Sequence, residues 1–367
     1  MAMQHTPLVM SRLIDRGATV APDVEVVTAA ESGPRRQSLG RTRDRAHQLA
    51  HALYDYGIRP GDRIGTFMWN GSRHLEAYHA AAGMGAVLHT INLRLSPDDL
   101  AYIIGHAQDR LIIADADTLP ILESLKGRLP SVEHIVVAVE EGFEDWTTDV
   151  APAVDYEEFI AGKPKRYEWP DLDENAPLGL CYTSGTTGHP KGVEYEHRSQ
   201  YLHTMAQCMT DSMGLSATDT VCGVVPMFHA MGWGVPWSAL MLGCKQVLPH
   251  RFMDPARLTE LMATEKVTLS AGVPTIWQGV KAVIEANPDA YDLSSLSRLT
   301  CGGSAPPKSL IRWYHDALGV EMIQGWGLTE TSPLATLSRR LMKHKHPSMS
   351  LDEQLENVGK AGQLMPG

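Results

Sequence analysis

The stretch Tyr182-Thr-Ser-Gly-Thr-Thr-Gly-His-Pro-Lys-Gly-Val193 directly follows an apolar, strand-like run that begins near residue 178. Its hydroxyl groups and closely approaching backbone amides can surround phosphate oxygens, and Lys191 adds a positive charge. The spacing does not match the Walker A pattern, because Gly185 is followed five residues later by Pro190 where that pattern needs a glycine before lysine. We therefore expect a phosphate-binding loop of a different type. The alternative, a polar surface turn, suits a shorter piece of such a sequence.

Helical patterns alternate with short apolar runs on both sides of this loop. Residues 44–57 carry apolar side chains at helical spacing, and a second helix is expected to begin with Ser96 as its N-terminal cap. This alternation predicts an α/β fold with largely parallel sheets covered by helices, in which ligands bind beyond the carboxyl ends of the strands. Strands are expected near 63–68, 111–114, 135–138, 178–182, 220–225, 267–271, 298–301 and 320–323, and further helices near 198–212, 255–264, 275–286 and 306–317.

The composition excludes several classes of function. With 367 residues and 43% hydrophobic residues, the chain can bury a large core and form more than one unit. Its formal charge of −11 argues against nucleic acid as a partner. No run approaches the roughly 20 apolar residues of a membrane span, and the N-terminal sequence lacks a secretory pattern. The five cysteines are scattered singly, so we expect buried thiols in a reducing cytoplasm.

The loop at 182–193 is similar to the signature loop of the adenylate-forming superfamily, which includes acyl-CoA synthetases, luciferases and the adenylation modules of peptide synthetases. The resemblance covers the chain from about residue 30 to its end and is closest to the fatty-acyl-CoA synthetase branch. It implies the family's N-terminal domain, with two largely parallel sheets sandwiched between helices in layers. It also implies that the β- and γ-phosphates of ATP are bound by Thr183, Ser184, Gly185, Thr186, Thr187, Gly188 and Lys191.

A second motif, Gln324-Gly-Trp-Gly-Leu-Thr-Glu-Thr-Ser-Pro333, also follows a predicted strand. Thr329 can donate a hydrogen bond to a phosphate oxygen, Glu330 is a hard oxygen ligand suited to Mg²⁺, and Trp326 offers a flat face to a base. The resemblance assigns the same roles and adds Gln324, Gly325 and Gly327 to the nucleotide site. Taken alone, the motif is as consistent with a plain turn, because Glu330 stands where a dinucleotide fingerprint needs its third glycine.

A third motif, Cys301-Gly-Gly-Ser-Ala-Pro306, lies between a predicted strand and a predicted helix. Gly302 and Gly303 allow the backbone to approach a ligand closely. The resemblance places this loop at the adenine pocket and at the carboxylate end of the acyl site, which adds Ser304 to the nucleotide site and Ala305 to the substrate site. The alternative is a tight strand-to-helix turn in which Ser304 caps the helix.

The fourth motif, Pro226-Met-Phe-His-Ala-Met-Gly-Trp-Gly234, bears on the substrate. The resemblance places His229 beside the acyl carboxylate, and it places Trp233 and Gly234 near the acyl tunnel. Peptide-synthetase modules carry an Asp after the corresponding Phe, which pairs with the amino group of their substrate. Here that position is His229, so a buried amine would lack its counter-charge and an amine-free acid is expected. Val273 and Pro274 would supply an apolar wall, although core packing explains them equally well.

These motifs predict ATP-dependent activation of a carboxylic acid, with Lys191, His229, Thr329 and Glu330 as catalytic residues, Mg²⁺ at Glu330 and CoA as the acyl acceptor. A medium-chain fatty acid, a short thioether acid and an aryl acid each remain candidates. A non-catalytic nucleotide- or acyl-binding homologue and a luciferase-like oxygenase are the alternative functions. The sequence leaves the oligomeric state open, a homodimer included.

The family pattern continues past Gly367 with a β-barrel and a C-terminal domain that carries a catalytic lysine. We therefore expect this chain alone to be inactive or impaired. We divide it into a first α/β subdomain at residues 1–170, a second subdomain with the nucleotide loops at 171–337, and an extended tail at 338–367.

Overall fold

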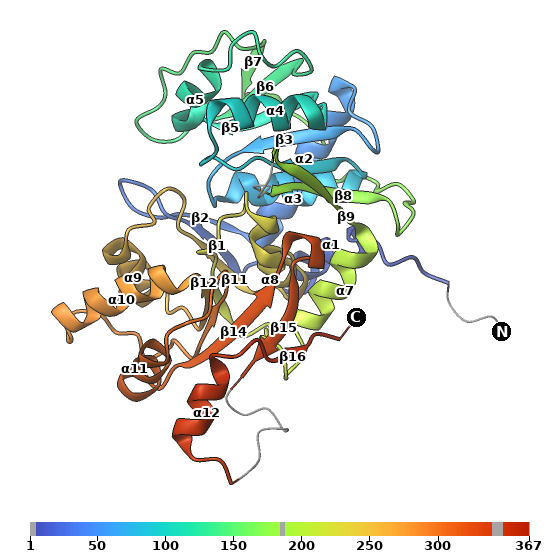
Figure 1. Cartoon of the computed structure of the whole chain (residues 1–367). Coiled ribbons are helices and arrows are strands. Elements are labelled where there is room, and N and C mark those ends of the chain that lie inside the picture. Colours follow the sequence, from blue (N-terminus) through green and yellow to red (C-terminus); the bar gives the residue numbers. More distant parts are fainter. Residues whose placement is uncertain (1–4, 184–187, 340–347, 367) are drawn as a thin grey trace.

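A computed structural model describes residues 5–183, 188–339 and 348–366 of the chain. Its strands form two sheets that lie one above the other in Figure 1, with helices around and between them. The fold is therefore the layered α/β arrangement that the alternation of strands and helices predicts. None of the helices in these ranges is long and apolar enough to cross a bilayer.

The upper sheet in Figure 1 has seven strands in the order β7-β6-β5-β3-β4-β8-β9. All neighbours are parallel except the last pair, which is an antiparallel hairpin. The strands are β3 (Arg63–Phe67), β4 (Val87–Thr90), β5 (Leu111–Asp115), β6 (His134–Ala138), β7 (Ala153–Asp155), β8 (Pro177–Thr183) and β9 (Lys191–Glu196). Its helices are α2 (Leu39–Tyr56), α3 (Ser72–Met84), α4 (Pro97–Ala107), α5 (Leu119–Glu123) and α6 (Tyr156–Ile160).

The lower sheet has nine strands in the order β16-β15-β14-β13-β12-β10-β11-β1-β2. Its central strands are parallel, and antiparallel strands close both edges. The strands are β1 (Glu25–Thr28), β2 (Arg35–Ser38), β10 (Thr220–Cys222), β11 (Lys245–Leu248), β12 (Leu269–Gly272), β13 (Arg298–Cys301), β14 (Glu321–Gly327), β15 (Leu334–Ser338) and β16 (Gln363–Leu364). The helices that follow along this part of the chain are α7 (His197–Gln207), α8 (Val235–Leu242), α9 (Pro255–Thr264), α10 (Pro274–Ala286), α11 (Lys308–Leu318) and α12 (Leu351–Val358).

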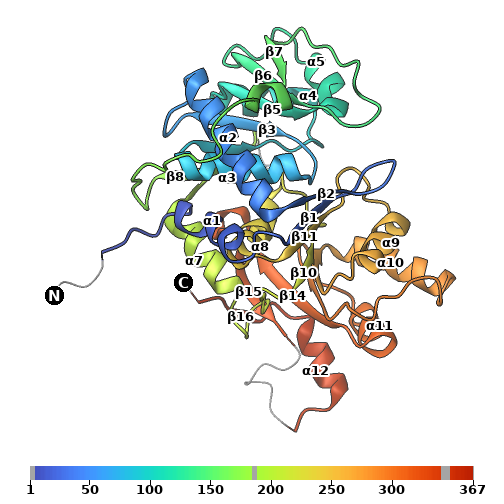
Figure 2. The same cartoon turned by 180° about the vertical axis from the view of Figure 1, so that it is seen from behind.

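One hydrophobic cluster joins the two layers. It contains buried side chains from α2 and α3 of the upper layer, from α8, and from the N-terminal helix α1 (Ser11–Val20). Figure 2 shows α1 and α8 between the two sheets. Four of the five cysteines are buried and Cys208 is half-buried, which agrees with the expected thiols. Burial raises the pKa of Cys222 to about 12, so this thiol stays protonated at neutral pH.

Local sequence signals explain the helix that follows Ser96. Its side chain accepts a hydrogen bond from the backbone of Asp99, and Pro97 occupies the first turn together with Asp98 and Asp99. The prediction of this N-terminus is confirmed, because the cap satisfies an amide that has no partner within the helix and the acidic side chains face the positive end of its dipole.

The two sheets do not follow the expected subdivision of the chain at residue 170. β1 and β2, from the N-terminal part, pair with the nine-stranded sheet through β11, whereas β8 and β9 complete the seven-stranded sheet. The expected extended tail from residue 338 contains a helix, α12, because Ser350 and Glu353 form a capping box that starts it. A subdivision into units remains a proposal, and its boundaries must allow for this exchange of strands.

Candidate functional site

The four predicted motifs lie at the carboxyl ends of β8, β10, β13 and β14, where ligands bind in sheets of this kind. The first residues of the second motif, 324–327, form the end of β14. A cavity of about 320 Å³ lies where the last three of these loops meet the loop after β4 of the other sheet. The predicted site residues that line it are His229, Trp233, Val273, Gly302, Gly303, Gly325, Gly327 and Thr329. The other lining residues are Asn92, Arg94, Val225, Pro226, Phe228, Ala230, Met253, Gly272, Ile276, Leu328, Pro333 and Leu334.

Two glycines of the third motif shape the cavity wall. A Cβ atom on Gly302 would lie 2.9 Å from the indole of Trp233 and 3.0 Å from the carbonyl oxygen of Gly325, so only a glycine lets these groups approach. Gly303 adopts a φ of +76°, which side-chain-bearing residues rarely adopt. Ser304 does not cap the following helix, because α11 begins after Pro307 and has no side-chain cap. Ser304 and Ala305 are exposed beside the cavity rather than in its lining.

Residues 230–234 of the fourth motif form a left-handed turn. The φ angles of Ala230, Met231, Gly232, Trp233 and Gly234 are 41°, 51°, 60°, 56° and 74°. Three of these residues carry side chains, for which this conformation is strained by about 1–2 kcal/mol each. Strain of this kind persists where surrounding contacts hold it, as they do at binding sites. The turn places Trp233 in the cavity wall, whereas Gly234 packs against His203 of α7 and does not line the cavity.

His229 lies at the mouth of the cavity. Its side chain is partly exposed to solvent, but the cavity walls around it reduce its hydration. The Arg94 guanidinium lies nearby. This desolvation and, to a smaller extent, the positive charge of Arg94 lower the pKa of His229. Its imidazole is therefore neutral at neutral pH. A neutral His229 can stabilise a nearby negative charge by donating a hydrogen bond, but not by carrying a positive charge.

The predicted phosphate loop is the connection of the β8–β9 hairpin. Thr183 pairs with Lys191 across the hairpin, and Lys191 is exposed. Gly188 adopts a φ of +101°, and the next residue, His189, stacks on Tyr102 of α4 with ring centroids 4.4 Å apart. Ser184, Gly185, Thr186 and Thr187 lie outside the described residues.

The second motif packs against the helix that follows this hairpin. Gln200 of α7 donates a hydrogen bond to the Ser332 carbonyl at 3.0 Å, and the backbone N–H of Leu334 donates to His203 at 3.3 Å. Burial, together with the charges of Cys181 and Glu330, raises the pKa of Tyr195 on β9. The second motif therefore lies beside β9 and α7, the strand and the helix that follow the first predicted nucleotide loop.

The side chains of the second motif differ in their accessibility. Trp326 is 46% exposed, and Glu330 is also exposed. Gln324 is buried, and with its amide oriented to donate, its nitrogen lies 2.8 Å from the Gly359 carbonyl and 3.1 Å from that of Val358. The side chain of Gln324 thus holds the end of α12 instead of lining the cavity. Pro274, expected in the substrate wall, is the buried first residue of α10.

Several lining residues were not predicted from the sequence. Asn92 and Arg94 follow β4 of the seven-stranded sheet, and Met253 follows β11 of the other sheet. They meet the last three motifs only because the two sheets pack with these loops facing each other. Asn92 and Arg94 could have been found from the general rule that loops after parallel strands carry function, because an apolar run precedes Asn92.

Glu330 is suited to hold a divalent cation. It is a carboxylate beside the Thr329 hydroxyl, both hard oxygen donors of the kind that Mg²⁺ prefers. Among the residues that the structure describes, no hydrogen bond or ion pair engages its carboxylate. The residues present therefore fit the expected Mg²⁺ at this position.

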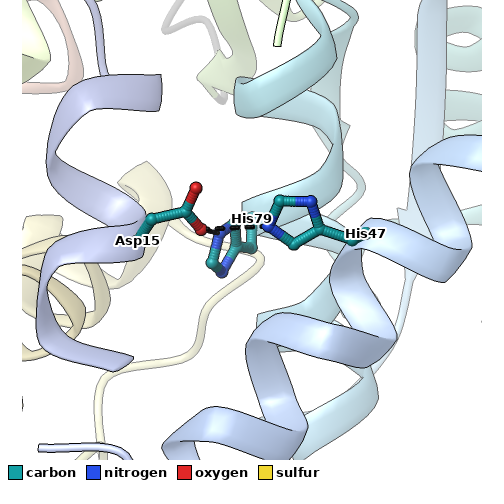
Figure 3. Close-up of side chains that lie close together, drawn as sticks. All are labelled: Asp15, His47 and His79. Atoms are coloured by element: carbon teal, nitrogen blue, oxygen red, sulfur yellow. Dashed lines mark hydrogen bonds and ion pairs between the residues drawn. The ribbon is translucent and has the colours of Figure 1, made fainter. Parts of the chain in front are cut away.

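A second group, Asp15, His47 and His79, has the composition of a metal site (Figure 3). The Nε2 atoms of His79 and His47 lie 2.8 and 3.2 Å from the same oxygen of Asp15, and Trp169 donates to the other oxygen at 2.7 Å. However, Nδ1 of His47 accepts a hydrogen bond from the backbone N–H of Tyr167 at 2.8 Å. The neutral imidazole must then carry its proton on Nε2, where a metal ligand needs a lone pair. This group is a hydrogen-bonded anchor for α1.

A third group, Asp115, Glu140 and His250, lies between the two layers. Glu140 already forms ion pairs with Arg35 and Arg73 at 2.7 and 2.9 Å, which satisfy its charge. His250 lies 3.4 Å from Asp115 and 3.8 Å from Glu140. We read this group as a buried network of charges and not as a metal centre.

Known proteins resemble this chain along nearly all of its length. It is 43% identical over 354 residues to a medium-chain-fatty-acid–CoA ligase of Ectopseudomonas oleovorans, which covers 96% of this chain and 64% of the relative. It is 42% identical over 360 residues to a 3-methylmercaptopropionyl-CoA ligase of Ruegeria lacuscaerulensis, which covers 98% of this chain and 66% of the relative. The chain thus spans slightly less than two thirds of the length of these relatives.

The fold also resembles that of solved structures. The crystal structure of an anthranilate CoA ligase in complex with anthranoyl-AMP superimposes on the whole chain with a TM-score of 0.82, at 24% identity and over 67% of the solved chain. The sequence of residues 14–367 matches the AMP-binding enzyme family. The signature hairpin, the neighbouring loop after β14 and the cavity between the two sheets agree with this match, and the chain belongs to the AMP-binding enzyme family.

Proposed function

We propose that this chain carries the ATP- and acid-binding part of an acid–thiol ligase, which activates an amine-free carboxylic acid as an acyl-adenylate and transfers the acyl group to CoA. The observation that carries the proposal is the lining of the cavity, which among the described residues includes no carboxylate. A buried ammonium group would have no counter-charge there, at a cost of several kcal/mol. The named substrates of the two relatives, a medium-chain fatty acid and 3-methylmercaptopropionate, are likewise acids without an amine.

The first half-reaction joins two anions. A carboxylate oxygen attacks the α-phosphorus of ATP, an O–P bond forms, and the bond to the departing pyrophosphate breaks. Lys191 and the Thr329 hydroxyl would bind phosphate oxygens, and a neutral His229 would donate a hydrogen bond at the carboxylate. Mg²⁺ held by Glu330 would neutralise phosphate charge. Catalysis here consists of positioning and charge neutralisation, and it requires no protein nucleophile.

In the second half-reaction, the thiol sulfur of CoA attacks the acyl carbon. A C–S bond forms, the thiol proton is released to solvent, and the C–O bond to AMP breaks so that AMP leaves. The lining of the cavity is mostly apolar, with Phe228, Met253 and Ile276 as large side chains, which suits an alkyl or aryl chain.

The test is exchange of labelled pyrophosphate into ATP by the purified full-length protein, with a panel of fatty, thioether, aryl and amino acids. We expect exchange with at least one amine-free acid and none with amino acids. Exchange with amino acids alone would contradict the reading of His229. Exchange with no acid, in a protein that still binds ATP, would favour a non-catalytic nucleotide-binding function.

Lys191→Ala should lower the exchange rate about 100-fold, since a preorganised donor to a developing charge is worth about that much in rate. Lys308→Ala is the matched control. Lys308 is an exposed lysine that pairs with Glu356 at 3.0 Å, and it does not line the cavity. Equal rates for the two variants would show that Lys191 does not act on the phosphates.

A further inference from the structure

One stretch of the cavity wall is held by side chains that come from the other layer. β10 ends at Cys222, and residues 223–227, which we call the wall segment, leave the nine-stranded sheet after a last hydrogen bond from the Gly223 N–H to the Val247 carbonyl at 2.9 Å. The segment contributes Val225 and Pro226 to the cavity lining and leads directly into Phe228 and His229, which also line it. The course of its backbone therefore sets the position of the wall against which an acid would bind.

Asn70 binds this backbone at three points. It follows β3 of the seven-stranded sheet and is only 2% exposed. Its Nδ2 group donates to the carbonyl oxygens of Gly223 and Val225 at 2.6 and 2.8 Å, and its Oδ1 accepts from the backbone N–H of Met227 at 2.7 Å. One amide thus bonds three backbone groups at the point where the chain departs from the sheet, where an unsatisfied buried group would be costly.

Tyr78 of α3 completes the arrangement. Its hydroxyl donates to the Met227 carbonyl at 2.5 Å, and its side chain is fully buried. Both backbone polar groups of Met227 are therefore bonded to side chains of the upper layer. The next residue, Phe228, is buried in the core of that layer with its ring 6.2 Å from that of Trp69.

We propose that Asn70 and Tyr78 are positioning residues for the acid pocket, which set the wall segment and through it His229, although neither lines the cavity. The inference rests on the proposed function. The inference distinguishes the two ligands. The hydrogen bonds of the Asn70 side chain go to the wall segment, whereas the described residues of the predicted nucleotide loops lie at the ends of β8 and β14. Loss of these hydrogen bonds should affect acyl binding and leave nucleotide binding intact.

The substitutions are Asn70→Asp and Tyr78→Phe. Asn70→Asp keeps the acceptor for Met227 and replaces the two donated hydrogen bonds by repulsion from two carbonyl oxygens. Tyr78→Phe removes one hydroxyl and keeps the ring. Tyr156→Phe is the matched control, because Tyr156 is equally buried and donates to Glu76 at 2.7 Å, but neither residue lines the cavity.

Calorimetry would measure binding of AMP and of an acyl sulfamate of adenosine, a stable mimic of an acyl-adenylate. We expect Asn70→Asp to weaken binding of the acyl compound about tenfold and Tyr78→Phe about threefold, the size of one or two lost hydrogen bonds. AMP binding should stay within about twofold, and the control should change neither value. Amide hydrogen exchange in peptides from residues 223–234 should accelerate in both variants and not in the control.

The outcomes separate the two ideas. Parallel losses of acyl and AMP binding, or unchanged acyl binding in both variants, would overturn the positioning role while the proposed function stands. A wild-type protein that binds AMP but no acyl compound would refute the proposed function, and the inference with it. If Asn70→Asp does not fold, Tyr78→Phe alone decides, because it preserves the packing of the ring.

Discussion

His250 is a residue whose charge is tied to the contact between the layers. It is 3% exposed, its backbone N–H donates to the Asn70 carbonyl, and its ring faces Asp115, Glu140 and Asp117. Burial alone would lower its pKa, but hydrogen bonding to Asp115 and the three carboxylates outweigh it and raise the pKa of His250. The surrounding arginines, Arg35, Arg73 and Arg251, pair with the carboxylates.

This raised pKa predicts a pH-dependent contribution to stability. The folded state binds the proton more tightly than the unfolded chain, so the stabilisation is full below the unfolded value near 6.5 and is lost as pH rises through the folded pKa. Urea unfolding of wild type and His250→Asn at about pH 6 and about pH 8.5 measures the effect. The difference in unfolding free energy between the two proteins should shrink at the higher pH.

Other buried histidines act in the opposite sense. Burial lowers the pKa of His74 and of His203 to about 4 in each case. The unfolded chain then binds these protons more tightly, so the folded protein loses stability as pH falls below 6.5. Taking the difference between wild type and His250→Asn removes their contribution. A difference that stays constant across the range would show that His250 does not carry a proton in the folded state.

At the scale of elements, the left-handed turn at residues 230–234 gives a sharp prediction. The backbone of Gly232 has a φ of 60°, and a Cβ atom added to this residue would lie 3.2 Å from the Pro236 ring. Gly232→Ala should therefore lower the free energy of unfolding by about 1–2 kcal/mol. Gly105→Ala is the control, because Gly105 lies inside α4 with open space around its Cβ position and should gain up to about 1 kcal/mol. Chemical denaturation measures the free energy of unfolding of both variants. A loss of stability in both would contradict the prediction.

The elements best predicted from sequence are those with local signals. α9 begins at Pro255 and ends at Thr264, as expected, because Asp254 caps it and proline fits its first turn. The sequence did not predict α8 or the strand β11 that follows it. α8 is apolar on all of its faces and lacks the amphipathic period that reveals a surface helix. β1 and β2 were missed because their place depends on a partner far along the chain.

The residues of the candidate site also divide into those with a local sequence signal and those placed by long-range packing. The four motifs carry their chemistry in their own residues, and most of the residues predicted from the last three line the cavity. Arg94, Met253 and Asn70 could not be identified in this way. Their roles come from the packing of one sheet against the other, which no local pattern encodes.

At the scale of the whole molecule, α1 connects the two layers. Asp15 binds His47 of α2 and His79 of α3, while the neighbouring Arg16 donates to the Met241 carbonyl of α8 at 2.9 Å. Gly17 packs so closely on the Leu240 carbonyl that no Cβ atom would fit. The helix thus stabilises both layers from a single turn.

Asp15→Asn should lower the free energy of unfolding by about 1–3 kcal/mol, because an amide cannot accept from all three donors and leaves a buried N–H unsatisfied. Asp44→Asn is the control. It breaks a partly exposed pair with Arg43 and should cost about 0–1 kcal/mol. Thermal and urea unfolding of both variants give the comparison, and equal losses would contradict a special role for α1.

The place of β1 in the nine-stranded sheet also affects how the protein is made. Val26 pairs beside Gln246, so a ribosome adding about 5–20 residues per second delivers the partner strand roughly 10–45 s after the first one. During that interval the nascent hairpin of β1 and β2 presents an unpaired edge with two apolar valines. Productive biogenesis therefore depends on shielding this early segment until translation is well past the middle of the chain.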